Sequence, residues 1–256
     1  MNLPSATTST HAHLARSGEI FLTDKEDASV RIFRDGDRFL LTADRRIGAS
    51  HCALQVLVSE EQYDRLKRFS STPGAQTAPR EVERKWRVPG GDPREIFEHL
   101  HDRGTVSSTV EIEQGYLILG ESEVRLRRKG SEFFLTLKGS GSLARCEVEV
   151  EISCPQFEAL WIGTEGRRLE KTRTSFSLPQ SNGEALVIEV DQFRGRHAPF
   201  AVVECEFPSE ASAEDFKAPA WFGVDVTDDP AYKNKCLVRD GVPQVSLQEL
   251  RAPIPR

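Results

Sequence analysis

The sequence lacks several features that would assign it to a class at once. No stretch approaches the roughly 20 apolar residues that a membrane-spanning helix requires. The leader MNLPSATTSTHAHLAR has no apolar segment of the kind found in secretory signals. The 5 cysteines are odd in number and show no paired spacing typical of zinc ligands or of a disulfide framework. We therefore expect a soluble protein of the reducing cytoplasm, with no membrane partner.

An excess of positive charge is also missing. The chain has 34 Lys and Arg against 40 Asp and Glu, a formal net charge of -6, which argues against a protein that coats nucleic acid or anionic membranes. We expect no nucleic-acid partner, and any anion-binding site must be local. With 256 residues, of which 38% are hydrophobic, the chain can form a globular core.

Composition divides the chain into parts. Residues 1–17 are small and polar, as in a mobile leader, and SSTPGAQTAP, residues 70–79, has the composition of a linker. The predicted divisions are a leader at 1–17, a degenerate half-repeat at 18–69, a linker at 70–80, a main domain at 81–240 and a tail at 241–256.

The half-repeat is predicted from an internal match. The segment that begins at Val30 aligns without gaps with the segment that begins at Val124, an offset of 94 residues, with 12 identities in 37 positions. The match predicts a duplicated hairpin, third strand and helix start. Four charged residues of the second copy are replaced in the first: Arg127 by Phe33, Lys138 by Asp44, Glu147 by Ala53 and Glu149 by Gln55. The first copy is thus expected to keep the strand pattern without the chemistry.

Alternation of apolar and polar residues predicts a largely antiparallel β domain after the linker. The expected strands are 81–88, 110–118, 122–129, 132–139, 145–152, 168–178, 185–192 and 200–207. The expected helices are 93–103, 155–161, 211–216 and 230–237. Many strands and few helices indicate an α+β fold, mainly antiparallel β, arranged as a barrel or a sandwich.

The predicted strands share an unusual charge pattern. Charged residues occupy alternate positions, and the residues between them are mostly apolar, so each strand has an apolar face and an ionic face. The charged positions are Glu81, Glu83, Lys85, Arg125, Arg127, Glu147, Glu149, Glu151, Lys171, Arg173, Glu189, Asp191, Glu204 and Glu206. A face turned to water would explain any one strand. Several strands carry only acids and others only bases, however, and like charges side by side are unfavourable in a sheet. This segregation favours a shared polar interior.

Such an interior requires partners for its charges. Oxygen ligands with no His or Cys nearby favour hard divalent cations, Mg²⁺ or Mn²⁺, over zinc. Lysines and arginines gathered at one place suit a substrate with several adjoining phosphates. Acids that bind a metal and bases that bind a triphosphate would satisfy both sets of charges.

Seven motifs occur here in a fixed order. They are ExExK at 81–85, RLR at 125–127, TLK at 136–138, alternating Glu at 147–151, EKTR at 170–173, E-x-D at 189–191 and E-x-E at 204–206. From residue 81 to about 238 the chain resembles the CYTH domains, the triphosphate tunnel metalloenzymes. The stretches EGRRLEKTR, PAWFGVDVT and YKNKCL are most similar to those of the short bacterial members that act as inorganic tripolyphosphatases. This resemblance implies an eight-stranded closed β-barrel, the triphosphate tunnel, with a few peripheral helices.

The resemblance also implies roles for individual residues. The metal-binding candidates are Glu81, Glu83, Glu147, which is an indirect or shared ligand, Glu149, Asp191, Glu204 and Glu206. The phosphate-binding candidates are Lys85, Arg125, Arg127, Lys138, Arg145, Lys171, Arg173, and Lys233 or Lys235. The candidates for a direct part in catalysis are Lys171, Glu149 and Tyr116.

The expected function is Mg²⁺- or Mn²⁺-dependent hydrolysis of inorganic tripolyphosphate to pyrophosphate and phosphate. Three alternatives use the same fold on an organic triphosphate: a thiamine triphosphatase, a nucleoside triphosphatase or an adenylyl cyclase. A fourth is a non-catalytic sensor that binds polyphosphate or a nucleotide. Members of the family usually begin near ExExK, so the preceding residues are expected either to pack outside the tunnel or to mediate self-association as a homodimer.

Overall fold

The chain forms two antiparallel sheets. The computed structural model describes residues 20–25, 28–47, 50–71, 82–120, 123–138, 147–179 and 185–244. The N-terminal sheet has the strand order β1 (Ile20–Lys25), β2 (Ala28–Asp35), β3 (Arg38–Ile47) and β4 (Ser50–Val58). The larger sheet has the strand order β13 (Val224–Asp225), β5 (Val82–Arg87), β12 (Ala201–Phe207), β11 (Ala185–Phe193), β10 (Arg168–Pro179), β6 (Thr105–Ile118), β7 (Glu123–Lys129), β8 (Glu132–Lys138) and β9 (Glu147–Glu151).

Short helices connect and cover these strands. The α-helices are α1 (Glu60–Ser71), α2 (Arg94–Arg103), α3 (Cys154–Trp161), α4 (Glu210–Asp215) and α5 (Asn234–Asp240). The 3-10 turns are η1 (Pro89–Gly91), η2 (Ile162–Thr164), η3 (Gly195–His197), η4 (Ala220–Phe222) and η5 (Pro230–Tyr232). The expected α+β class with mainly antiparallel strands is therefore confirmed. In the described part of the chain, no helix is both long enough and apolar enough to span a bilayer.

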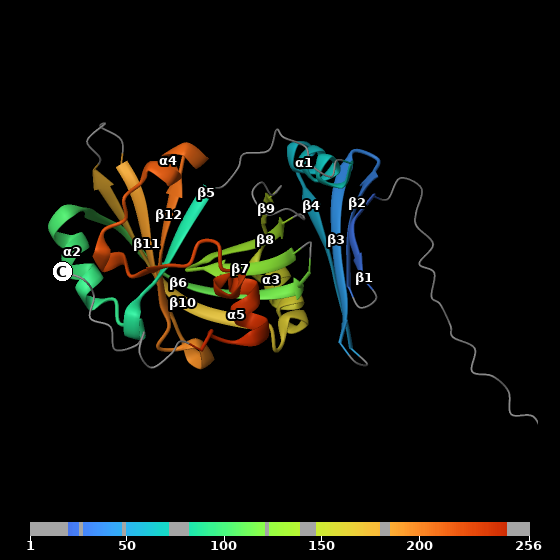
Figure 1. Ribbon diagram of the computed structural model, residues 1–256. Coiled ribbons are helices and arrows are strands. Elements are labelled where there is room, and N and C mark those ends of the chain that lie inside the picture. The colour runs from blue at the N-terminus through green and yellow to red at the C-terminus, as the bar shows by residue number, and fades with distance from the viewer. Residues whose placement is uncertain are drawn as a thin grey trace, which may run out of the picture.

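The prediction of a closed eight-stranded barrel is wrong. Pairing in the larger sheet runs from β13 to β9, and no pairing between described residues joins its two ends. The edge of β5 is taken up at Trp86 and Arg87 by the short strand β13, and β9 at the opposite end has only 5 residues. The sheet is strongly curved instead: β5, β11 and β12 are steeply inclined to β6, β7, β8 and β10 (Figure 1).

Most predicted elements lie close to their observed positions, with two differences. Strand β6 begins at Thr105, five residues before the expected start, because its first half pairs with the end of β10. The helix expected at 230–237 is divided at Lys233, whose extended backbone (φ -72°, ψ 138°) separates η5 from α5.

The apolar face of the larger sheet is turned away from the charges. Ile96 and Leu100 of α2 are buried in one core together with Phe176, Ile188 and Val203 from the sheet. A second core lies on the charged side of the sheet, under η5 and α5, where the buried residues are Tyr116, Phe193, Val202, Tyr232 and Leu237, among others. Helix α2 thus covers the outside of the sheet, whereas η5 and α5 pack on the charged side, where Tyr116 and Tyr232 line the same cavity as Lys85.

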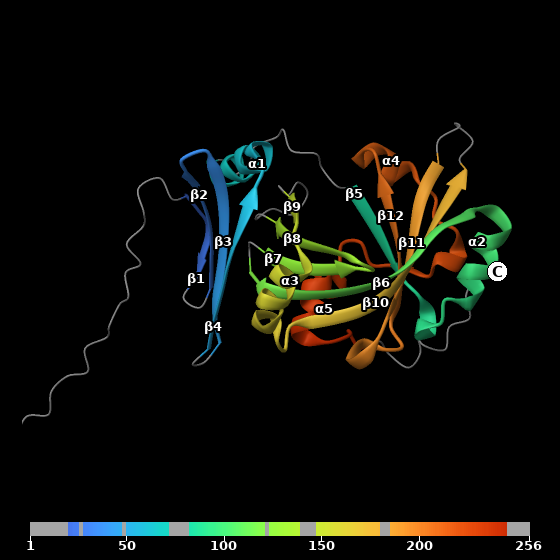
Figure 2. The ribbon, with the colours of Figure 1, turned by 180° about the vertical axis from the view of Figure 1, so that it is seen from behind.

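The N-terminal sheet packs against the outside of β7, β8 and β9, next to α3. Both views of the ribbon show this arrangement (Figures 1 and 2). Buried residues from both sides form one core, which includes Ile32 and Leu41 of the N-terminal sheet and Leu126, Leu135 and Leu160 of the larger part. The expectation that the extension lies on the outside agrees with this packing. Whether the segment arose by duplication stays a prediction.

Candidate active site

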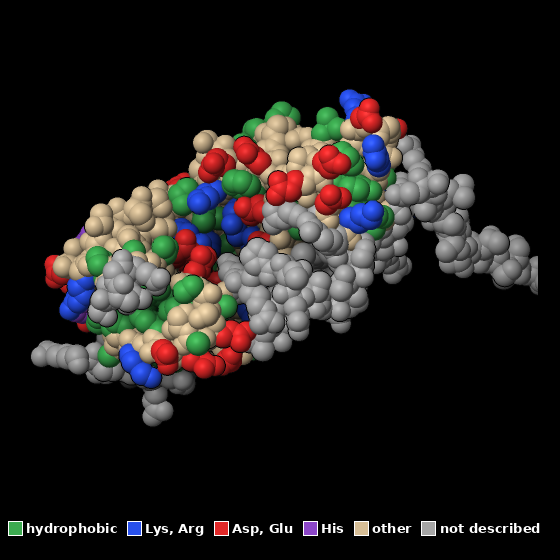
Figure 3. Space-filling model, turned by 90° about the horizontal axis from the view of Figure 1, so that it is seen from above, with side chains coloured by type: hydrophobic (Ala, Val, Ile, Leu, Met, Phe, Trp, Pro, Cys, Tyr) green, Lys and Arg blue, Asp and Glu red, His purple; other side chains and the backbone are tan. Residues whose placement is uncertain are grey.

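The charged side chains singled out from the sequence share one face of the larger sheet, which we call the ionic face. Strand β5 shows how the alternation works: Glu83 and Lys85 line the ionic side, whereas Trp86 is buried in the core on the other side. Arg84 also points outward, where it pairs with Asp225. Figure 3 shows Lys, Arg, Asp and Glu side chains gathered around a hollow in the surface.

Sheet register brings acids and bases on the ionic face together. Residues directly opposite each other on antiparallel strands have Cβ atoms roughly 4.5–5.5 Å apart, which is close enough for polar side chains to interact. The opposed acid–base pairs are Lys85 with Glu204, Arg173 with Asp191, and Lys138 with Glu147. Thr136 stands opposite Glu149 in the same way and donates a hydrogen bond to it. The alternating sequence pattern therefore produces ion pairs only because of the order in which the strands lie.

A central cluster occupies the middle of the sheet. Its members are Lys85, Lys171, Arg173, Glu189, Asp191 and Glu204. Arg173 donates from Nε to Asp191 Oδ1 and from Nη2 to Asp191 Oδ2, each at 2.7 Å, and Lys171 Nζ also donates to Oδ2. The side chain of Asp191 is fully buried and that of Lys171 is only 3% exposed. Asp191 thus holds two cations at fixed positions.

Glu204 joins the central cluster to β5. Lys85 Nζ lies 2.7 Å from Glu204 Oε1 and 3.3 Å from Glu83 Oε1, and Arg173 donates to the other oxygen of Glu204. Burial alone would raise the pKa of Glu204, but Lys85, Lys171 and Arg173 outweigh it and hold the pKa well below its usual range. Burial opposes the charge of Lys85 as well, yet Glu204 and Glu83 raise its pKa. Both groups are ionised at neutral pH.

Two members of the central cluster are less well matched to their surroundings. Burial, followed by repulsion from Arg173, lowers the pKa of Lys171. Burial raises the pKa of Glu189, although Glu189 pairs with Arg173. An anion bound beside Lys171 would favour its charged form, as expected for a phosphate-binding lysine.

A second group, the β7–β9 cluster, consists of Arg125, Arg127, Lys138, Glu147 and Glu149. Lys138 Nζ lies 2.7 Å from Glu147 Oε2, and Arg125 Nη2 lies 3.3 Å from Glu147 Oε1. Arg127 Nη1 is 3.7 Å from Glu149 Oε2. Burial raises the pKa of Glu147, but Lys138 and Arg125 outweigh it and lower the pKa below its usual value.

The arginines of the β7–β9 cluster have donors left over. Within the described residues, the buried Nε atoms of Arg125 and Arg127 have no hydrogen-bond partner, and neither has Oε1 of Gln114. Burial and the nearby charge of Arg125 lower the pKa of Arg127 to about 10, so that its guanidinium is still charged at neutral pH. Unused buried donors on arginine suit an anionic ligand, because phosphate oxygens can accept from them.

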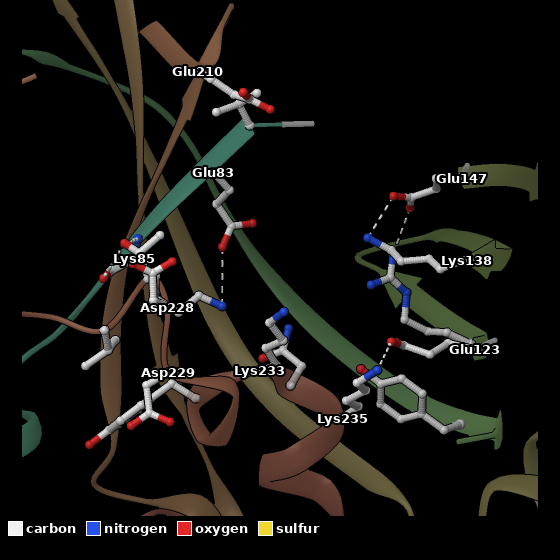
Figure 4. Close-up of a pocket in the computed structure, with 17 residues that line it drawn as sticks. Glu83, Lys85, Glu123, Lys138, Glu147, Glu210, Asp228, Asp229, Lys233 and Lys235 are labelled. Atoms are coloured by element: carbon white, nitrogen blue, oxygen red, sulfur yellow. Dashed lines mark hydrogen bonds and ion pairs between the residues drawn. The ribbon is translucent and has the colours of Figure 1, made fainter. Parts of the chain in front are cut away.

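A cavity of about 560 Å³ lies beside these clusters. Glu83 and Lys85 approach it from β5, while Lys138 and Glu147 approach it from the far side (Figure 4). Lys233 and Lys235 reach it from the start of α5. Lys235 Nζ lies 2.7 Å from Glu123 Oε1. Helix α5 thus adds two lysines to the cavity, between β5 and the β7–β9 cluster.

Tyr116 contributes a neutral hydroxyl to the cavity wall. Its ring is 1% exposed, and its oxygen accepts a hydrogen bond from Gln114 Nε2 at 3.0 Å. Burial raises the pKa of Tyr116 to about 12, so the phenol keeps its proton at physiological pH. It can donate a hydrogen bond but does not act as a base.

Three of the remaining candidates are not placed in these clusters by the structure. Glu81 and Arg145 lie outside the described residues. Glu206 is exposed and stands opposite Glu83 in the register. Sequence reasoning missed Gln114 and Glu123. Each stands two positions before a predicted site residue, Tyr116 or Arg125, so the alternation that placed the others on the ionic face could have identified both.

The arrangement of the acids bears on metal binding. Among the described residues, no group of three or more Asp, Glu, His or Cys side chains is placed to hold a metal ion, because acids of the ionic face are paired with Lys and Arg. Carboxylates do converge in twos on a positive charge, as Glu83 and Glu204 do on Lys85. Mg²⁺ is usually bound by one or two carboxylates together with substrate phosphates and water. The donors present fit that mode of binding and not a cage made only of protein groups.

The chain is similar to several known proteins. Residues 79–225 match the CYTH domain family. A 130-residue stretch is 48% identical to the inorganic triphosphatase of Nitrosomonas europaea and spans 50% of this chain and 83% of that protein. The inorganic triphosphatase of Acetivibrio thermocellus is 35% identical over 130 residues, which span 50% of this chain and 79% of that protein. A crystal structure of an inorganic triphosphatase is 41% identical, covers 62% of this chain and 93% of its own, and superposes with a TM-score of 0.45.

Proposed function

This chain belongs to the CYTH domain family, and we propose from that premise that it is a hydrolase acting on a triphosphate, with inorganic tripolyphosphate as its substrate and pyrophosphate and phosphate as its products. The observation that carries the proposal is the convergence of buried basic side chains, held by acids, on the ionic face beside one cavity. Two relatives that carry the name inorganic triphosphatase support it.

We assign the catalytic domain to residues 81–240, with the linker at 70–80 and the tail at 241–256; the first two residues of that linker belong to α1, which ends at Ser71. The phosphate chain would lie along the ionic face, from the central cluster to the β7–β9 cluster. The residues proposed to bind its oxygens are Lys85, Arg125, Arg127, Lys138, Arg145, Lys171, Arg173, Lys233 and Lys235. Positioning and electrostatic stabilisation supply most of the acceleration in phosphoryl transfer, and these side chains provide both.

The contacts of Asp191 indicate that it positions other side chains in this scheme. Both of its oxygens are engaged by Arg173 and Lys171, so it holds these cations where charge develops on the leaving phosphate. Because Lys171 is buried with a lowered pKa, negative charge on the substrate would fix its proton.

Glu149 is the proposed acceptor for the proton of the attacking water. Its Oε2 accepts a hydrogen bond from Thr136 Oγ1 at 2.9 Å, which orients the carboxylate. Its side chain is 37% exposed, so that water can reach it. The water oxygen forms a bond to the terminal phosphorus, the anhydride P–O bond breaks, and the electron pair leaves with pyrophosphate. Tyr116 donates a hydrogen bond to a phosphate oxygen, as its protonated phenol allows.

A divalent cation, Mg²⁺ or Mn²⁺, completes the proposal. One or two carboxylates, together with substrate oxygens, would hold it, and the candidates are Glu81, Glu83, Glu147, Glu149, Asp191, Glu204 and Glu206. When bound, the ion would polarise phosphate oxygens and acidify the attacking water.

The test is phosphate release by the full chain. Tripolyphosphate is compared with ATP, thiamine triphosphate and pyrophosphate, each with Mg²⁺, with Mn²⁺ and with EDTA. Metal-dependent release that is fastest with tripolyphosphate is expected. Preference for another triphosphate would change the substrate, and binding without turnover would indicate a sensor.

A charge reversal locates the reaction. Lys171→Glu should abolish tripolyphosphate binding because it places a carboxylate beside Asp191 and Glu204 on the ionic face. Arg194→Ala is the matched control, since Arg194 is 49% exposed and pairs with Glu111 at 2.8 Å; it should keep full activity. An active Lys171→Glu variant would exclude the ionic face as the site.

A further inference from the structure

The N-terminal sheet and the β7–β9 region have the same strand register. In the first, Arg31 pairs with Thr42 and Thr42 pairs with Gln55. In the second, Arg125 pairs with Thr136 and Thr136 pairs with Glu149. Each residue of the second set stands 94 positions after its counterpart in the first. The offset of 94 residues found in the sequence therefore also relates the strand pairings of the two regions.

Local contacts repeat at the same offset. Ser59 and Gln62 bond reciprocally before α1, from Ser59 N to Gln62 Oε1 at 2.8 Å and from Gln62 N to Ser59 Oγ at 3.1 Å. Ser153 and Gln156 form the same two bonds before α3, at 2.7 and 3.4 Å. Both helices thus begin with the same capping box.

Turns and aromatic pairs repeat as well. The hairpin turns use Gly36 and Gly130, with φ of 60° and 59°, a backbone conformation that glycine adopts without strain. The ring centroids of Phe39 and Tyr63 are 4.9 Å apart, and those of their counterparts Phe133 and Phe157 are 5.0 Å apart.

Counterpart residues meet in a single core. Eight buried positions of the N-terminal unit (β2, β3, β4 and α1) and their eight counterparts in the second unit (β7, β8, β9 and α3) belong to one hydrophobic cluster. The counterparts are Val30 and Val124, Ile32 and Leu126, Leu41 and Leu135, Ala43 and Leu137, Val56 and Val150, Val58 and Ile152, Tyr63 and Phe157, and Leu66 and Leu160. The two units bury the same face against each other.

The contacts between the units are reciprocal. Helix α1 of the first unit contacts β9 of the second, and α3 of the second contacts β4 of the first. Since α3 is the counterpart of α1 and β9 is the counterpart of β4, each helix meets the strand equivalent to its own neighbour. Such reciprocity is the signature of an interface between two copies of one surface related by a two-fold axis.

We propose that the outer face of β7, β8, β9 and α3 is a self-complementary interface that can pair with the same face of a second copy of the chain. In this chain the N-terminal unit occupies that interface. The N-terminal unit takes the place of a second subunit and prevents the chain from forming a dimer through this face. Without it, large apolar residues such as Leu126 and Leu135 would form an exposed patch of the kind that drives association. The ionic face lies on the other side of the sheet, so the inference does not depend on the proposed function.

The test displaces the N-terminal unit within the full chain. Ile32→Glu places a carboxylate at a fully buried position of the shared core. We expect its mass by light scattering to be twice that of the wild-type chain, with β2–β4 losing protection from hydrogen exchange and β7–β9 keeping it. Leu57→Glu is the matched control: Leu57 belongs to the same unit but is 58% exposed, and this variant should behave as the wild type does.

A double variant identifies the surface. Ile32→Glu combined with Leu126→Glu, its counterpart, should return the mass to that of the wild-type chain because both self-complementary faces are then interrupted. The proposal is overturned if Ile32→Glu keeps the wild-type mass, whether β2–β4 lose protection or not, or if it forms open-ended aggregates.

If Ile32→Glu unfolds the whole chain, a cut after folding answers the same question. A protease site inserted at residues 72–80 allows the wild-type protein to be cleaved and its two parts separated. The larger part should then run as a dimer whose β7–β9 strands stay protected, and a monomeric larger part would overturn the proposal.

Discussion

Replacing Asp191 by asparagine tests the electrostatic reasoning most directly. The carboxylate is fully buried and is engaged by Lys171 and by both donors of Arg173. The amide side chain of the variant would have nearly the same shape but would leave two buried cations short of a negative charge. Removing one partner from a buried ion pair costs about 3–5 kcal/mol. The low end applies here, since Arg173 still contacts Glu204 and Glu189.

That cost sets a measurable shift in melting temperature. For a chain of this size each kcal/mol lowers Tm by about 2–4 °C, so a loss of about 3 kcal/mol predicts a drop of roughly 6–12 °C in a thermal melt followed by circular dichroism. Tripolyphosphate should restore more stability to this variant than it adds to the wild type, because its phosphates replace the lost charge.

The matched control is Asp92→Asn. Asp92 pairs with Arg94 at the surface, where it is about half exposed, and surface substitutions usually change stability by no more than about 0.5 kcal/mol. A melting temperature of Asp191→Asn within about 2 °C of the control would refute the view that Asp191 holds the central cluster together.

Three further predictions concern other parts of the site. The pKa values of Glu204 and Glu147 are lowered in the folded protein. Their stabilising contribution is therefore complete above the unfolded pKa of about 4.3 and is lost as the pH falls through the folded pKa values. The urea midpoint should decline below about pH 4, and a flat profile there would contradict this. Tyr116→Phe removes a neutral donor, since the pKa of Tyr116 is about 12, and should lower kcat/KM roughly 10- to 150-fold, equally at pH 7 and pH 9; a loss confined to one pH would point to an ionising role. Gly115→Ala would bring Cβ to 2.5 Å from Thr164 Oγ1 and should destabilise the fold by about 1–3 kcal/mol, measured by urea unfolding; an unchanged midpoint would show that β6 and η2 separate easily.

Much of the site could be read from alternation alone. The period of two assigned Glu83, Lys85, Asp191 and Glu204 to one face, and the structure places them on one face. The same rule would have added Glu123 had it been applied to every polar position of the strands.

The pairing partners could not be read in this way. Lys85 is opposite Glu204, more than 100 residues later in the chain, because β5 joins the sheet beside β12. Two other features, the open sheet and the mutual pairing of acids and bases, were also not visible in the motifs. The motif list predicted metal-binding carboxylates, whereas ion pairs engage most of those described.

The sequence by itself determined the antiparallel class, the positions of most strands, the ionic and apolar sides of each strand and the internal match at an offset of 94 residues, because all of these follow from local periodicity and composition. Only the tertiary structure decided which acid meets which base, that the sheet stays open, and that the two matching segments bury the same face against each other. These depend on strand order and on contacts between residues far apart in the chain, which no local pattern encodes.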